Sequence, residues 1–159
     1  MVDVRLVGFP LRVWQVATEH HEELRREFAL LMLSSTHSDV PRRLIELIED
    51  ITVRFAGATE SGDVERDAAL ARGEESVDLT FRVPAAGRDA SIALGRMLDE
   101  ADDFCRAGDQ LLTLATPESA LAFRRWYLSE FVRQIDGLPA RPWPGVEQAI
   151  GIPVESAAG

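Results

Sequence analysis

Four long stretches of this chain repeat their apolar residues every three to four positions, and this helical period is the feature that most constrains its fold. The stretches cover residues 11–33, 41–55, 85–106 and 117–136. Each would form a helix with one apolar face, and that face must be buried against another element. A shorter helix is expected within residues 63–72. The sequence therefore predicts a predominantly helical protein.

Three shorter stretches indicate strands. Residues 76–83 alternate between polar positions and the apolar residues Val77, Leu79, Phe81 and Val83. Residues 4–9 and 111–115 are short apolar runs. We therefore expect an α+β fold with a small three-stranded sheet covered by four or five helices. Strands 76–83 and 111–115 should be parallel, because a right-handed crossover through a helix joins them.

The length of 159 residues and the apolar fraction of 46% suit one domain. We expect a globular body over residues 1–137, followed by a Pro- and Gly-rich, partly flexible tail over residues 138–159. The chain shows no signal-peptide pattern and no apolar run of membrane-spanning length. Its single cysteine, Cys105, cannot form an internal disulfide. These features favour the cytoplasm.

The composition excludes several chemistries. The net charge is −10, and all 17 Lys and Arg positions are Arg. The chain also has no Asn. Phosphate-binding P-loops and Schiff-base enzymes need a Lys, and protein kinases need both a Lys and an Asn. The negative charge disfavours nucleic acids and anionic membranes as partners. We expect no cofactor, and a non-enzymatic role is favoured.

His20, His21 and Glu23 are candidate metal ligands. His20 and Glu23 lie three residues apart, so both can project from one helical face beside His21. The alternative is that His20 packs inward while the acidic residues around it form a solvated face.

An acidic cluster follows at Asp99, Asp102 and Asp103. It could face a partner protein or hold a hard cation such as Mg²⁺. Arg106 lies three to four residues after the cluster, which favours simple ion pairing along the helix as the alternative.

The segment 123–131 is the best candidate for an interaction surface. If Phe123, Tyr127 and Phe131 point inward, Trp126 lies off that stripe. Trp and Arg are residue types that anchor protein interfaces. The predicted surface consists of Arg124, Arg125, Trp126, Glu130 and Arg133. The alternative is that Trp126 packs under the C-terminal tail near residues 142–144.

Four segments, 20–29, 73–79, 99–108 and 123–127, together resemble an uncharacterised family of actinobacterial proteins. That family is associated with signalling systems that contain anti-sigma-factor-like ATP-binding proteins. The resemblance implies a regulatory accessory role, with such a regulator as partner, and it supplies no catalytic residues. The chain lacks the Asn-containing helix and the Asp-x-Gly-x-Gly motif of the ATP-binding members.

Two functions follow as hypotheses. The first is a non-enzymatic regulatory module of bacterial signalling that binds another protein or a second copy of itself. The second is a domain that binds a small molecule or divalent cation, or an enzyme whose site assembles only in the fold. The second hypothesis predicts a closed pocket in which His20, His21 or Asp102 converge with shifted pKa values.

Overall fold

A computed structural model describes residues 1–33, 39–107 and 116–153. Helices dominate it, which confirms the predicted predominantly helical α+β class. No described helix has the length and apolar character needed to cross a membrane. The elements in chain order are β1 (Val2–Pro10), α1 (Leu11–Leu33), α2 (Val40–Arg54), α3 (Glu60–Ala71), β2 (Ser76–Val83), α4 (Gly87–Ala107), α5 (Glu118–Ile135) and α6 (Val146–Ala149).

Within the described ranges the sheet has two antiparallel strands, not three. The third expected strand, 111–115, lies outside the described residues, as does the parallel pairing expected of it. β1 carries an irregularity between Leu6 and Phe9. Gly8 adopts a positive φ of 66° there, a conformation that favours glycine. Its N–H donates to Asp78 Oδ1 at 2.8 Å, which ties the bulge to β2.

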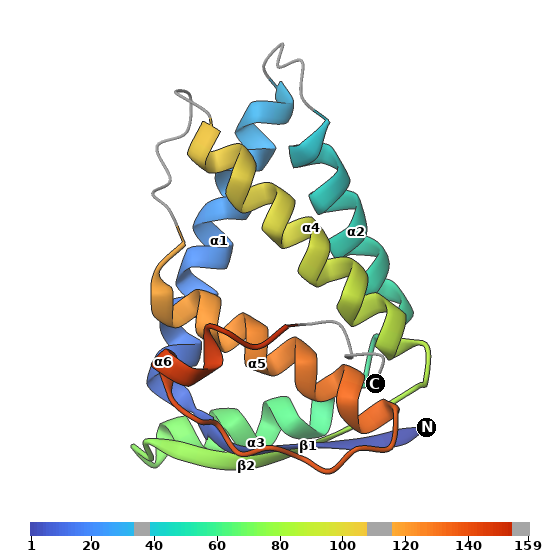
Figure 1. The fold of residues 1–159 in the computed structure, drawn as a ribbon, viewed down its shortest axis with the longest axis vertical. Coiled ribbons are helices and arrows are strands. Elements are labelled where there is room, and N and C mark those ends of the chain that lie inside the picture. Colours follow the sequence, from blue (N-terminus) through green and yellow to red (C-terminus); the bar gives the residue numbers. More distant parts are fainter. Residues whose placement is uncertain (34–38, 108–115, 154–159) are drawn as a thin grey trace.

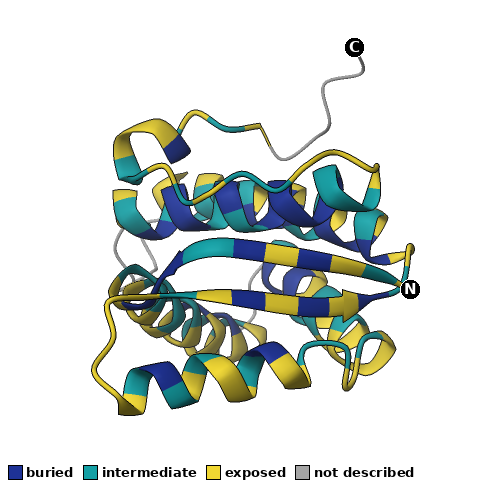
Figure 2. Cartoon of the chain, turned by 90° about the horizontal axis from the view of Figure 1, so that it is seen from below, coloured by how far each residue is buried: buried dark blue, intermediate teal, exposed yellow. Residues whose placement is uncertain are grey.

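The sheet lies at one end of the molecule (Figure 1). The later part of α1 packs with α2 and α4 toward the other end, while α5 crosses between that group and the sheet. α3 lies against β2. Figure 2 shows the sheet from below, with buried and exposed residues alternating along both strands. One face of the sheet therefore packs on the body, and the other faces solvent.

Two separate hydrophobic clusters result from this arrangement. The first joins the sheet, α5 and the start of α1, and includes Phe9, Phe81 and Trp126. The second joins α1, α2 and α4, and includes Phe28 and Leu44. α1 is long enough to contribute to both. Two cavities are lined by residues of both clusters and therefore lie at the boundary between them.

The expectation that Trp126 is exposed is wrong, because α5 is covered on more than one side. Trp126 is 0% exposed. Its Nε1–H donates to the Arg141 carbonyl at 3.0 Å, and its ring meets Trp143 edge-on at 5.4 Å between centroids. The alternative, packing under residues 142–144, is what the structure shows. Because α5 contacts the sheet, α1, α4 and α6, it presents no solvent-exposed face at Trp126.

Residues 138–153 form a segment that packs against the first cluster through Trp143, Val146, Ile150 and Ile152. The packed body thus extends past the boundary expected at residue 137. The Trp143 N–H donates to the carbonyl of Val7 beside the bulge at 2.9 Å. The short helix α6, which the sequence did not predict, lies within this segment.

Glu130, on α5, binds Arg141 of the segment 138–153. Like Trp126, it is not part of an exposed surface. Its side chain is 0% exposed. The carboxylate accepts hydrogen bonds from Arg141 Nε at 2.8 Å, from the Arg141 backbone N–H at 2.9 Å and from Gln134 Nε2 at 3.0 Å. Arg133 lies nearby, with its Nε 3.8 Å from Glu130. Glu130 is therefore a buried anchor for residues 138–153.

Candidate functional site

A pocket of about 280 Å³ lies between α1, α4 and α5, at the boundary of the two hydrophobic clusters. Its walls are mainly apolar and aromatic, with a few polar side chains among them. The apolar walls include Trp14, Leu24, Leu98, Phe123 and Tyr127. The polar lining groups include His20, His21, Thr116 and Arg124. Apolar walls with a few convergent polar groups are typical of small-molecule sites.

Three of these polar groups, those of His20, Thr116 and Arg124, are joined through Asp102 by a chain of hydrogen bonds. Arg124 Nη2 donates to Asp102 Oδ2 at 2.6 Å, and the Thr116 hydroxyl donates to Asp102 Oδ1 at 2.6 Å. His20 Nε2 lies 3.1 Å from the same hydroxyl. Because the hydroxyl has one proton and gives it to the carboxylate, it must accept from His20 Nε2–H. This assigns the neutral His20 tautomer and leaves Nδ1 without a hydrogen bond from any described residue.

The order of these groups argues against nucleophilic catalysis. In a hydroxyl–His–carboxylate triad, the imidazole lies between the other two groups and removes the hydroxyl proton. Here the Thr116 hydroxyl lies between His20 and Asp102, and its proton already points at the carboxylate. His20 donates to the hydroxyl and cannot act as its base. The arrangement orients side chains at the pocket wall and does not activate Thr116.

Both histidines are held in the neutral form by their surroundings. Burial lowers the pKa of His20 below its ordinary value, although the carboxylates of Asp102 and Glu23 oppose that shift. Burial also lowers the pKa of His21, and the positive charge of Arg25 adds to the effect. The pocket therefore presents uncharged imidazoles at neutral pH.

The lowered pKa values predict a loss of stability as the pH falls below 6.5, the ordinary pKa of His. There the unfolded chain takes up protons at His20 and His21 that the folded protein does not, so the free energy of unfolding decreases. Urea unfolding at about pH 7.5 and about pH 5.5 measures this loss. A double variant, His20→Gln with His21→Gln, should lose less stability over that interval. An equal loss in both proteins would contradict the assignment.

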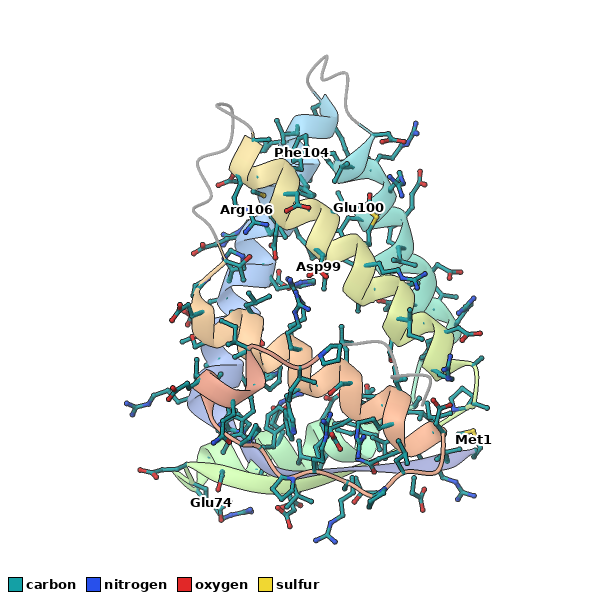
Figure 3. The ribbon with its side chains drawn as sticks, viewed as in Figure 1. Met1, Glu74, Asp99, Glu100, Phe104 and Arg106 are labelled. Atoms are coloured by element: carbon teal, nitrogen blue, oxygen red, sulfur yellow. The ribbon has the colours of Figure 1, made fainter. Side chains whose placement is uncertain are left out.

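Asp99 and Asp102 contact side chains of α5. Arg124 Nη2 contacts Asp99 Oδ1 at 2.9 Å as well as Asp102, and Arg125 Nη2 lies 3.4 Å from Asp99. Asp99 lies between α4 and α5 (Figure 3). The neighbouring Glu100 faces α2, where it pairs with Arg43. Asp99 and Asp102 thus form contacts between helices.

Asp103 remains at the surface, where it pairs with Arg106 on its own helix. This is the ion pairing that the sequence offered as the alternative. The pair is exposed on both sides, so we expect it to contribute little to stability.

The predicted metal ligands do not come together as a set. His20 and His21 line the pocket, while Glu23 is exposed on α1. Among the described residues, no group of three or more His, Cys, Asp or Glu side chains could hold a metal ion. Cys105 is half-buried, and burial raises the pKa of its thiol to about 11, so it is not an activated nucleophile.

A second, smaller cavity of about 170 Å³ lies between α2, α4, α5 and β2. Leu94, Tyr127 and Leu128 line both cavities. Burial raises the pKa of the Tyr127 hydroxyl to about 12, and no described residue forms a hydrogen bond with it. Tyr127 is thus a neutral phenol in the wall between two apolar spaces.

Sequence reasoning placed His20, His21, Asp99, Asp102 and Arg124 in three separate candidate sites. Only its second hypothesis predicted that His20, His21 or Asp102 would converge in a closed pocket. Sequence reasoning did not assign Thr116 to any site, and it took Tyr127 as pointing inward. Thr116 lies 96 positions from His20 in the chain, so no local spacing could have revealed their contact. Comparisons with protein-family models, with curated proteins and with solved structures find no match to this chain.

Proposed function

We propose that this chain is a small-molecule-binding domain whose ligand occupies the pocket between α1, α4 and α5. The observation that carries the proposal is the convergence of His20, Thr116 and Arg124 on one side of a 280 Å³ space with apolar walls. An engineered apolar cavity of about 150 Å³ binds benzene. The larger pocket here can accept a ring with a short substituent.

Two further observations favour a ligand over a packing defect. The pocket lies at the boundary between two hydrophobic clusters, where a ligand would complete the packing of both. Its polar side is ordered by hydrogen bonds from three parts of the chain, α1, α4 and the start of α5. Pre-ordered polar groups on an apolar wall reduce the entropy lost on binding. The regulatory role implied by the resemblance fits a domain that responds to a small molecule.

Benzyl alcohol is a suitable probe, because it combines one ring with one hydroxyl. We expect saturable heat of binding by calorimetry with the unaltered chain. Ala17→Phe should weaken binding at least about tenfold, or about 1.4 kcal/mol, because Ala17 lines the pocket and a phenyl ring would fill it. Gln15→Phe places the same side chain at an exposed position of the same helix and should leave binding unchanged. Equal binding by all three proteins would exclude this pocket as the site.

Protein binding is a second candidate, on a surface other than the one expected from the sequence. A groove of about 870 Å³ runs past Met1, Phe55 and Val64, where β1 begins and β2 ends. Val64 in this groove is 65% exposed, and nearby Val53 is 76% exposed. Exposed apolar side chains beside a groove favour contact with another protein or a second copy of this chain.

A further inference from the structure

We infer that the pocket between α1, α4 and α5 selects uncharged ligands, and that Asp99 and Asp102 set this selectivity by neutralising Arg124. The inference rests on the proposed function, since it concerns the ligand of the same pocket. It assigns the two carboxylates a role in specificity, although neither is among the lining residues.

Among the described residues that line the pocket, Arg124 is the one that carries a permanent charge. An arginine in an apolar pocket ordinarily indicates an anionic ligand. Here its guanidinium is already paired. Nη2 contacts Asp102 at 2.6 Å and Asp99 at 2.9 Å, and the side chains of Arg124 and Asp102 are both only 13% exposed. Arg125 also lies 3.4 Å from Asp99, so these two arginines and two carboxylates together carry no net charge, and Arg124 offers a ligand no unpaired positive charge.

An anion in the pocket would therefore lose its hydration without gaining a net positive partner. Both carboxylates are at hydrogen-bond distance from Arg124, so their negative charges would oppose the attraction of an anion to Arg124. A cation would be repelled by Arg124 and would lose its hydration against apolar walls, because neither carboxylate is among the lining residues. The neutral imidazoles of His20 and His21 offer hydrogen bonds and no charge. An uncharged molecule avoids both penalties and can still accept a hydrogen bond from the Arg124 nitrogens that are not engaged by Asp99 and Asp102.

The effect of ligand charge can be tested with four ligands of similar size and shape. Benzyl alcohol and ethylbenzene are uncharged, benzoate is an anion and benzylammonium is a cation. Calorimetry at neutral pH should show the two uncharged ligands binding at least about tenfold more tightly than the two charged ones. Benzoate binding as tightly as benzyl alcohol would overturn the inference. Equal binding of all four would overturn it too, while the proposed function would stand. If none of the four binds, the proposed function fails together with the inference.

A charge-removing variant tests the assigned residues directly. Asp99→Asn removes one of the two charges that face Arg124 without altering the Asp102–Thr116 contact. We expect the affinity for benzoate to rise about tenfold while that for ethylbenzene stays the same. Asp103→Asn is the matched control, because it makes the same change in net charge one turn away at an exposed pair with Arg106. Equal gains in both variants, or no gain in Asp99→Asn, would contradict the role of Asp99.

Discussion

Replacing Trp126 with alanine is expected to lower the free energy of unfolding by about 4 kcal/mol, within the range for truncating a buried aromatic residue. Trp126 is fully buried and contacts Phe9, Phe123 and Trp143 through its ring. Its indole N–H also satisfies the Arg141 carbonyl. The substitution removes the ring from the first hydrophobic cluster and leaves that carbonyl without its partner. Urea unfolding followed by circular dichroism measures the change.

Two further variants serve as controls for the loss of stability in Trp126→Ala. Trp126→Phe keeps a ring but loses the N–H and some volume, so it should cost about 2 kcal/mol. Val53→Ala, at a side chain that is 76% exposed, should change stability by less than about 0.5 kcal/mol. A loss below about 1 kcal/mol for Trp126→Ala would mean that Trp126 is exposed, as the interaction-surface hypothesis required.

Arg141→Met is expected to destabilise the protein by about 3 kcal/mol. The substitution keeps an apolar stem but removes the guanidinium that donates to Glu130 Oε1 and to Ser129 Oγ. Glu130 is fully buried, so its carboxylate would lose its main charged partner without gaining water. Breaking one side of a buried ion pair is costly because the other charge remains.

A double-mutant cycle tests whether the Glu130–Arg141 pair is the cause. Glu130→Gln combined with Arg141→Met should cost at least about 1 kcal/mol less than the sum of the two single changes. Arg106→Met breaks the exposed pair with Asp103 and should cost less than about 0.5 kcal/mol. Additive losses in the double variant would show that the two side chains act independently.

Hydrophobic period predicted the two described strands and the long helices of this fold because those elements form mainly from local patterns. Strand 76–83 was predicted with the bounds that β2 has, and α1 with its observed bounds. α5 was harder, since buried residues occur on more than one of its faces, including Trp126 and Phe131. A single inward stripe therefore could not describe it, and Trp126 was assigned to the surface.

The sequence offered a closed pocket and the packing of Trp126 under residues 142–144 only as alternatives, and local patterns could not decide for either. Residues 138–153 lack a helical or strand period over most of their length, and they are held by contacts such as Trp143 to Val7 that join distant parts of the chain. The hydrogen bonds that link His20, Thr116 and Asp102 are also long-range. The pocket itself arises because two clusters that share α1 do not interdigitate completely. Such a gap is a property of tertiary packing.

The most direct test of the account is to map where a ligand binds. In a nuclear magnetic resonance titration with benzyl alcohol, the account predicts saturable shifts confined to residues that line the pocket, including the rings of His20 and His21 and the methyl groups of Leu24 and Leu98. Shifts that fail to saturate, or that centre on the groove near Met1 and Val64, would contradict it.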